Sequence, residues 1–387
     1  TLEDRLADRR ERRTGGRGAV IPDEEINELF AVPSPCATLY LGLSDQMDGI
    51  AADRAVRWRR LRDSLAADGA DGATLGALDE VVASLGPQNA ALAACAADGR
   101  VVWCHRLRRQ VADRAVWGSL PCTLPMLAYR QSSVPCVVVL TDRTGADLRV
   151  AGDGLRFAGE VVGSDDEIER NAPGGWSQRR YQDRAEDSWD HNAAQVAEAV
   201  TELTERVDAA LVVLAGDVRA VQLLRKHLPP RVTPLVHQLE HGGRHPGRSD
   251  RFHSQEVREL VEAEVRDRTR AVLDRFAEDR AHGRAVDGVP ATLAALVRAQ
   301  VGTLLVVDDP GDDRAAWYGP EPGDVATEPG ALARLARRAG SPPTTGRLAD
   351  LAVRAAWGTG AAVRVLPADL PGAPTDGLGA LLRYPSP

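Results

Sequence analysis

The sequence predicts a multidomain protein of the α/β type with mixed α+β organisation, and three observations lead to that prediction. The chain has 387 residues, enough for two or three domains at roughly 100 to 200 residues each. Apolar runs of strand length alternate with longer stretches in which apolar residues recur every three or four positions. Changes in composition then divide the chain into a charged arm at 1–31, a mixed α/β domain at 32–133, a central domain at 134–273 and an α/β/α domain at 274–387.

The arm and the first domain differ in amino-acid composition and patterning. Arginines and acidic residues intermingle through residues 1–31, which is typical of a mobile arm or of a helix lying on a partner. The Asp98–Gly99 pair predicts a tight hairpin turn. The elements expected around it are a strand at 36–41, helices at 52–67 and 75–85, and strands at 90–94 and 101–105.

The central domain begins with strands separated by short polar turns, which predict an antiparallel meander at 137–140, 146–151 and 155–162. One long amphipathic helix follows, because apolar residues step by three and four through Ala185, Trp189, Ala193, Val196, Val200, Leu203 and Val207. A buried strand at 211–215, a helix at 217–227, a loop at 237–252 and a helix at 256–281 complete the domain.

The last domain alternates helices with strands, which predicts a three-layer α/β/α sandwich with a sheet in the middle. Its expected elements are a helix at 292–298, a strand at 301–307, a helix at 345–356, and strands at 362–366 and 380–384.

The charge balance bears on the class of partner. The chain carries 48 basic and 56 acidic side chains, a net charge of −8, which disfavours indiscriminate binding to polyanions. Lys226 is the single lysine, so the other basic residues are arginines, although a codon-composition bias would explain this excess equally well. Arginines that cluster locally still neutralise phosphates whatever the total charge is.

The sequence also predicts a compartment. No apolar stretch approaches the ~20 residues that a membrane-spanning helix needs, and the charged start is unlike a signal peptide. The odd number of cysteines and the lack of a Cys-x-x-Cys motif favour small buried hydrophobes over disulfides or zinc; they are Cys36, Cys95, Cys104, Cys122 and Cys136. We therefore expect a cytoplasmic protein without a membrane partner.

The most informative segment is the loop at 171–181, which leads into the long helix. Gly174 and Gly175 allow backbone conformations closed to other residues and close approach to a ligand. Ser177 is placed to cap the helix, whose first-turn amides favour an anion. An indole beside arginines suits base stacking and phosphate binding; the side chains are Trp176, Arg179, Arg180 and Arg184. On this pattern alone, an ordinary surface loop is the more common explanation.

Other clusters offer weaker candidates. The helix at 52–67 presents Arg57 and Arg60 within a run of arginines that is either an RNA-facing surface or a solvated face. Carboxylates at 165–169 fit a solvated charge run better than general acid–base catalysis.

Metal and cofactor sites are not expected. Gly242 and Gly243 argue against the helical spacing that a metal would need in the histidine-rich loop, and a flexible or RNA-contacting loop is favoured; the histidines are His237, His241, His245 and His253. No phosphate-binding loop or dinucleotide fingerprint occurs, so no cofactor is expected.

The segment Gly174–Tyr181, together with Asn192 and Val196–Glu198, resembles the central domain of archaeo-eukaryotic peptide-chain release factors. In that family a Gly-Gly-Gln loop precedes a serine, a basic–aromatic pair, and a helix with an asparagine and a Val-Ala-Glu step. Further similarity, also to the Pelota branch, lies at Asp142, Gly145–Ala146, 211–216 and 377–384. The resemblance covers about residues 134 to 387, and the first domain is similar to that of bacterial members of the superfamily.

The resemblance implies entry into the ribosomal aminoacyl site, with the central loop directed at the peptidyl-transferase centre. In release factors, backbone groups around the loop glutamine position water for hydrolysis of peptidyl-tRNA. Here Trp176 replaces that glutamine, and Gln178 lies two residues later on a helix, so its amide points elsewhere. The codon-reading motifs of the release-factor first domain are absent from the sequence.

The expected function is therefore a ribosome-binding factor of idle or stalled ribosomes, acting in hibernation or stress. Ribosomal RNA, peptidyl-site tRNA and a translational GTPase are the implied partners. One alternative is a peptidyl-tRNA hydrolase in ribosome rescue, with Gly174, Gly175 and Gln178 as catalytic candidates; another is a cytosolic binding protein that does not act on ribosomes. The expected RNA-binding residues are Trp176, Ser177, Arg179, Arg180, Arg184, Arg57 and Arg60.

Overall fold

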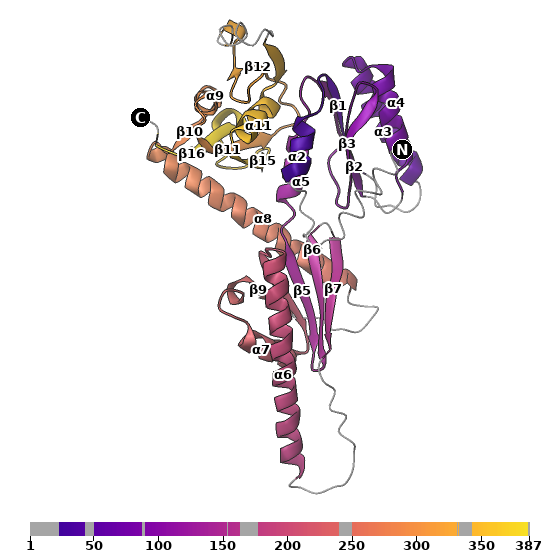
Figure 1. Cartoon of the computed structure of the whole chain (residues 1–387), viewed down its shortest axis with the longest axis vertical. Helices are drawn as coiled ribbons and strands as arrows, with labels where there is room; N and C mark the ends of the chain where they lie inside the picture. The colour runs from indigo at the N-terminus through magenta and orange to yellow at the C-terminus, as the bar shows by residue number, and fades with distance from the viewer. Residues whose placement is uncertain are drawn as a thin grey trace. The chain divides into compact units, whose positions relative to one another are not determined.

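The computed structural model describes residues 23–42, 50–86, 90–152, 154–162, 177–239, 250–330, 332 and 343–385. The chain forms two compact units (Figure 1). The central unit is Ser132–Val265, and the composite unit joins Ile21–Gln131 to Arg266–Pro387. Both units combine helices with sheets, which confirms the predicted mixed α/β fold class.

The central unit is built on a five-stranded sheet of order β7-β6-β5-β8-β9. Its strands are β5 (Cys136–Asp142), β6 (Gly145–Gly152), β7 (Gly154–Val162), β8 (Leu211–Gly216) and β9 (Val236–Gln238). The first three pair antiparallel, which confirms the meander, whereas β8 pairs parallel with both β5 and β9. His237 lies in β9, so the expected loop at 237–252 is wrong at its start; short strands such as β9 carry too few residues to show alternation.

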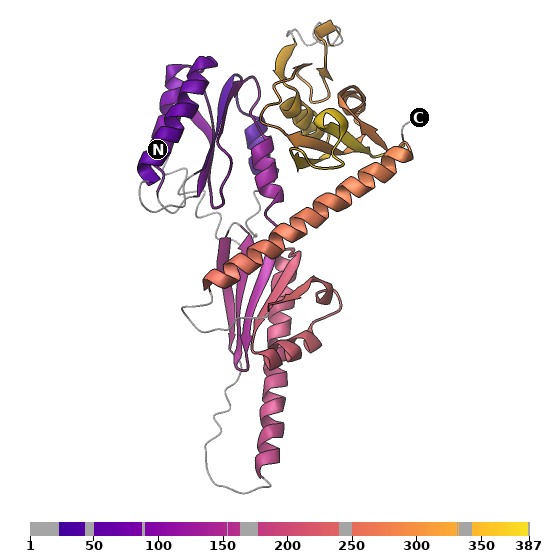
Figure 2. The ribbon, with the colours of Figure 1, turned by 180° about the vertical axis from the view of Figure 1, so that it is seen from behind.

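Helices cover both faces of this sheet, which is why β5 and β8 are apolar over most of their length. Val137 and Val139 face α6 (Ser177–Arg206) and α7 (Val218–His227). Cys136 and Val138 face the first part of α8 (Asp250–Ala281), where Val257 is buried. Figures 1 and 2 show α6 and α8 on opposite faces of β5 to β7.

The composite unit has two lobes, and its first lobe contains an antiparallel sheet of order β3-β2-β1-β4. Its elements are α2 (Asp23–Phe30), β1 (Cys36–Gly42), α3 (Ile50–Ala67), α4 (Gly72–Ala83), β2 (Ala91–Ala97), β3 (Arg100–Leu107), β4 (Arg114–Gly118) and α5 (Leu124–Gln131). The Asp98–Gly99 hairpin is confirmed, because both residues have the positive φ, 51° and 70°, of the tight turn. Part of the expected arm is helical: Ile26 and Leu29 of α2 are fully buried.

The second lobe contains a sheet of order β10-β16-β11-β15 and a small sheet of order β13-β12-β14. Its elements are β10 (Ala285–Asp287), α9 (Val289–Val297), β11 (Val301–Asp308), β12 (Ala315–Tyr318), β13 (Val325–Ala326), β14 (Thr344–Arg347), α11 (Leu348–Gly358), β15 (Ala362–Pro367) and β16 (Leu378–Leu382). One face of the larger sheet packs with α9 and α11, and Leu273 and Phe276 of α8 pack on the other. These are the three layers that the alternating pattern predicts.

Polar contacts join the two lobes around a shared core. Arg114 donates to Asp308 across 2.6 Å, with both side chains mostly buried. The side-chain amide of Gln131 bonds the edge of β15 on both sides of Arg364: its Nε2 donates to the Val363 carbonyl, and its Oε1 accepts from the Val365 amide. The lobes therefore share hydrogen bonds as well as apolar surface.

Asp350 on α11 is the most deeply buried carboxyl of this junction, at 2% exposure. It accepts a hydrogen bond from the Thr123 amide at 3.0 Å and lies 3.7 Å from the Arg347 guanidinium. Burial raises its pKa from 3.8 to about 6, in spite of the opposing field of Arg347. Folding therefore shifts Asp350 toward its protonated form, which predominates below about pH 6.

A raised carboxyl pKa gives a definite pH dependence. The stability that protonated Asp350 contributes is fully present below the unfolded-state pKa and is lost as the pH rises from about 4 through 6. Asp350→Asn keeps an acceptor for Thr123 and cannot ionise. Between about pH 4 and pH 7, the unfolding free energy of the natural chain should therefore fall by about 2 kcal/mol relative to this variant. Urea unfolding of both chains at each pH measures this difference in unfolding free energy. The contributions of the other carboxylates are the same in both chains and cancel. Equal changes of unfolding free energy with pH in the two chains would contradict the prediction.

Candidate functional site

The candidate site is built around α6, the longest element of the central unit. Its 30 residues span about 45 Å at 1.5 Å per residue. The helix begins at Ser177, eight residues before the apolar stepping predicts. Figure 1 shows its first half continuing past the ends of β5 and β6. We call residues 177–188 the projecting segment.

The second half of α6 is anchored in the core of the central unit. From Asn192 onward, one stripe of the helix is buried; it consists of Asn192, Ala193, Val196, Ala197, Val200 and Leu203. These side chains pack on β5, β6, β8 and α7. A continuous helix transmits that anchoring, so the projecting segment is held by the half that packs and needs no core of its own.

The turn between β5 and β6 supports α6 where the projecting segment begins. The Oδ1 atom of Asp142 accepts from the amides of Thr144 and Gly145, at 2.8 and 3.1 Å, and from the Thr144 hydroxyl. A Cβ on Gly145 would overlap the Val161 carbonyl oxygen of the neighbouring strand. Asn192 Nδ2 on α6 then donates to the Arg143 carbonyl at 3.2 Å. The turn is therefore rigid and is tied to the helix.

A second tie joins α6 to α7. The Oδ1 atom of Asp190 lies 3.2 Å from the Lys226 ammonium and 3.0 Å from His227 Nε2. The interactions with the nearby His227 and Lys226 side chains hold the pKa of Asp190 below its usual value. Asp190 therefore stays ionised and fastens the base of the projecting segment to the last turn of α7.

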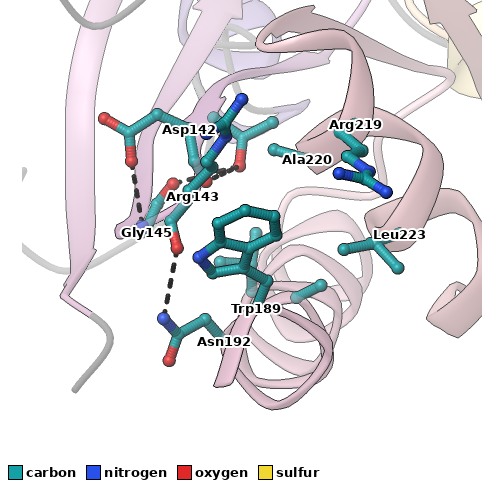
Figure 3. Close-up of a pocket in the computed structure, with 11 residues that line it drawn as sticks. Asp142, Arg143, Gly145, Trp189, Asn192, Arg219, Ala220 and Leu223 are labelled. Atoms are coloured by element: carbon teal, nitrogen blue, oxygen red, sulfur yellow. Dashed lines mark hydrogen bonds between the residues drawn. The ribbon is translucent and has the colours of Figure 1, made fainter. Parts of the chain in front are cut away.

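A small hollow lies between the β5–β6 turn, α6 and α7 (Figure 3). Its centre is the half-buried indole of Trp189, with the Arg143 guanidinium 4.7 Å and the Arg219 guanidinium 5.9 Å from the ring centroid. Stacking of this kind attracts a cation to the ring face and fixes its direction. The remaining lining includes Thr141, Gly145, Asn192, Ala193 and Leu223.

Only some of the predicted loop residues lie in the described part of the chain. Gly174, Gly175 and Trp176 lie outside the described residues. The other members occupy the first turns of α6, where the backbone is helical; they are Ser177, Gln178, Arg179, Arg180 and Arg184.

The arginines of α3 divide into two groups. Arg57 forms a two-pronged ion pair with Asp113, at 2.7 and 2.6 Å, which makes it a structural tie to the segment before β4. Hydrogen bonding to Asp113 raises the pKa of Arg57. Arg54 donates to the Leu85 carbonyl, whereas Arg60 is exposed. Arg60 is therefore better placed than Arg57 to meet a partner.

The described residues show few other candidates for a functional site. Within the described part of the chain, no three histidine, cysteine or acidic side chains gather closely enough to hold a metal ion. All five cysteines are free thiols, and four of them are buried. No helix among the described ranges has the length and apolar character to cross a bilayer.

Sequence reasoning did not identify the hollow around Trp189. Its residues come from three elements that are far apart in the chain, and the sequence assigned Trp189 to the apolar stripe of the helix. One signal was present: Trp189 stands among polar residues, seven positions before the dense part of that stripe begins at Val196–Ala197. A large aromatic outside the continuous apolar stripe is often a contact residue rather than core.

Residues 135–282 match the sequence model of the bacterial archaeo-eukaryotic release factor family 2. An uncharacterized protein of Mycobacterium tuberculosis is 28% identical over 374 residues, covering 93% of this chain and 96% of the relative. Two solved structures align at a TM-score of 0.40. One is Saccharomyces cerevisiae Dom34, 9% identical, covering 94% of this chain and 93% of that chain; the other is archaeal Pelota, 14% identical, covering 95% and 96%.

Proposed function

From the match of residues 135–282 to the bacterial archaeo-eukaryotic release factor family 2, we propose that this chain is a member of that family and binds the ribosome. It would occupy the aminoacyl site of idle or stalled ribosomes, as a hibernation or stress factor, with three domains at 32–133, 134–273 and 274–387. The loop before α6 would be directed at the peptidyl-transferase centre.

The projecting segment of α6 is the observation that carries this proposal. At 1.5 Å per residue, residues 177–188 form an arm of about 18 Å beyond the first buried turn. An isolated helix of this length is marginal in water, so its rigidity comes from the anchored half. Such an arm suits a narrow, polar, preformed channel, and it carries three arginines for phosphates; they are Arg179, Arg180 and Arg184.

A non-hydrolytic role is favoured by the residue types of the loop. Trp176 stands where the release-factor family has glutamine, and an indole has one donor and no acceptor with which to orient water. Gln178 belongs to the first turn of α6, so its position is fixed by the helix and not by the loop. Ribosomal RNA is the main partner of this proposal, and peptidyl-site tRNA and a translational GTPase are the further ones.

Co-sedimentation with purified ribosomes tests this function. The chain should pellet with vacant 70S ribosomes at about 0.1 M salt and be released as salt rises, because arginine–phosphate contacts release counterions. A pre-bound aminoacyl-site tRNA should reduce the pelleted fraction. Absence of the chain from the pellet at every salt concentration would favour the remaining alternative, a binding protein that does not act on ribosomes.

Peptidyl-tRNA hydrolysis is the second candidate function, since Gly174 and Gly175 precede a helix as the release-factor loop glycines do. Peptide release from stalled ribosomes separates the two roles. We expect no release above background from the natural chain, because the loop glutamine is missing. Release that disappears in Gly175→Ala, while that variant still pellets with ribosomes, would establish the hydrolase.

A further inference from the structure

We propose that Lys226 is an acylation site, and that an activated acyl donor, an acyl phosphate or an acyl thioester, loosens the projecting segment of α6 by modifying its amine. Lys226 lies in the last turn of α7, within the central unit. The modification needs no ribosome, and only its effect on ribosome binding rests on the proposed function.

Lys226 is the single lysine of the chain, and every other one of the 48 basic residues is an arginine. An arginine guanidinium stays protonated, whereas a lysine amine can lose its proton and is a target of acylation. Whatever the origin of the arginine excess, a donor that reacts with lysine side chains can therefore modify this chain at one position.

The amine of Lys226 is accessible to a reagent. Its side chain is 68% exposed, and Nζ donates to the Oδ1 atom of Asp190 at 3.2 Å. The Asp190 side chain is itself 39% exposed. Ion pairs between exposed side chains are weak, because water replaces each partner at little cost. This contact therefore does not protect the amine from an acyl donor.

The same contact is one of the ties between α6 and α7. Asp190 lies two residues after the projecting segment, and its Oδ1 atom is also 3.0 Å from His227 Nε2. An arginine at position 226 would provide the same charge, with more hydrogen-bond donors. The property that lysine adds at this tie is an amine that can be acylated.

The reaction is an acyl transfer, without oxidation or reduction. The Lys226 ammonium first gives a proton to water, and the electron pair of Nζ then attacks the acyl carbon. A nitrogen–carbon bond forms, and the bond from that carbon to the phosphate oxygen or the thioester sulfur breaks. The phosphate or thiolate leaves with the electron pair, and the nitrogen releases a second proton to water. The product is a neutral amide.

Loss of the charge weakens the tie. The amide keeps one N–H group, but a hydrogen bond between charged partners is roughly twice as strong as a neutral one. His227 remains beside Asp190, and the buried stripe of α6 from Asn192 onward is untouched. We therefore expect the helix to open more often at and before Asp190, while the anchored half keeps its stability.

Hydrogen exchange tests this inference on the chain without ribosomes. The natural chain is treated with acetyl phosphate in one arm and with acetyl-CoA in the other, and peptide mapping locates the acetyl group. Lys226 should be acetylated in at least one arm, which then identifies the class of donor. Amides of residues 183–190 should exchange about two- to fivefold faster, and those of 196–203 should not change. Absence of the acetyl group from Lys226 in both arms would overturn the site.

Three variants separate the tie from other effects of the reagent. K226R keeps the charge, so treatment should leave its exchange unchanged. K226Q carries a neutral amide and should match the acetylated natural chain without treatment. D190N removes the carboxylate, so acetylation of Lys226 should add nothing to its exchange. Unchanged exchange in the acetylated natural chain, or equal acceleration in treated K226R or D190N, would show that the tie does not mediate the effect and would overturn the inference.

Co-sedimentation extends the test to the ribosome. The acetylated chain should bind ribosomes about two- to fivefold more weakly than treated K226R, because a looser segment loses more freedom on binding. Equal affinities would contradict a regulatory role for the site. If the natural chain never pellets with ribosomes, although acetylation still accelerates exchange, the proposed function fails and the acylation site stands.

Discussion

Gly216→Ala should unfold the central unit or destabilise it by at least about 3 kcal/mol. Gly216 ends β8 with a φ of 139°, a region that side chains rarely adopt, and its Cβ would overlap the Thr141 carbonyl oxygen of β5. That oxygen also accepts from the Asp217 amide at 3.1 Å. The atoms in the way are backbone atoms of Thr141 and not the end of a flexible side chain. The parallel pairing of β5 with β8 and the start of α7 would therefore both have to move.

Urea unfolding followed by circular dichroism measures this loss, and Gly159→Ala is the matched control. Gly159 lies in β7 of the same sheet, and a Cβ there would meet no atom within 4 Å. The control should change the unfolding free energy by less than about 1 kcal/mol. Equal unfolding midpoints for the two variants would show that the close approach of β8 to β5 is not needed.

Reversing two charges on the projecting segment should abolish most ribosome binding. In Arg180→Glu/Arg184→Glu, both changes fall in the first turns of α6, and each replaces an attraction to phosphate by a repulsion. We expect at least about a tenfold loss of affinity near 0.1 M salt, measured by co-sedimentation over a ribosome titration. Helix propensity changes little, since arginine and glutamate are both good helix formers.

Arg206→Glu/Arg225→Glu is the control for this pair, with the same change of net charge in the same unit. Arg206 and Arg225 are exposed on α6 and α7, away from the projecting segment. The control should keep ribosome binding within about threefold of the natural chain, a free-energy change below about 1 kcal/mol. A comparable loss in both variants would mean that total charge, and not the projecting segment, determines binding.

The long helices and strands were predictable because residues on a buried face are apolar and recur at regular spacing in the sequence. The strands of the meander, β8, β11 and β15 were all recognised from apolar runs. For α6, the apolar stepping starts at Ala185, whereas the helix starts at Ser177. A helix that extends past its core has no apolar stripe to show, so its beginning was not predictable from the pattern.

Elements that depend on distant contacts were missed. The segment Leu124–Gln131 has Pro125 and an irregular pattern, yet α5 forms because Leu124, Met126 and Leu127 pack into the core shared by both lobes. Strands β12 to β14 have two to four residues each, too few for alternation to be seen. The stacking of Arg143 and Arg219 on Trp189 likewise exists only after three elements have packed together.

Gln131 has a consequence for self-association. β15 is the last strand of its sheet, and an uncovered edge strand is a template on which another chain can add a strand and begin aggregation. The Gln131 side chain satisfies the Val363 carbonyl and the Val365 amide, which are the groups that an added strand would use. A single amide side chain thus imitates a neighbouring strand and keeps the edge from recruiting one.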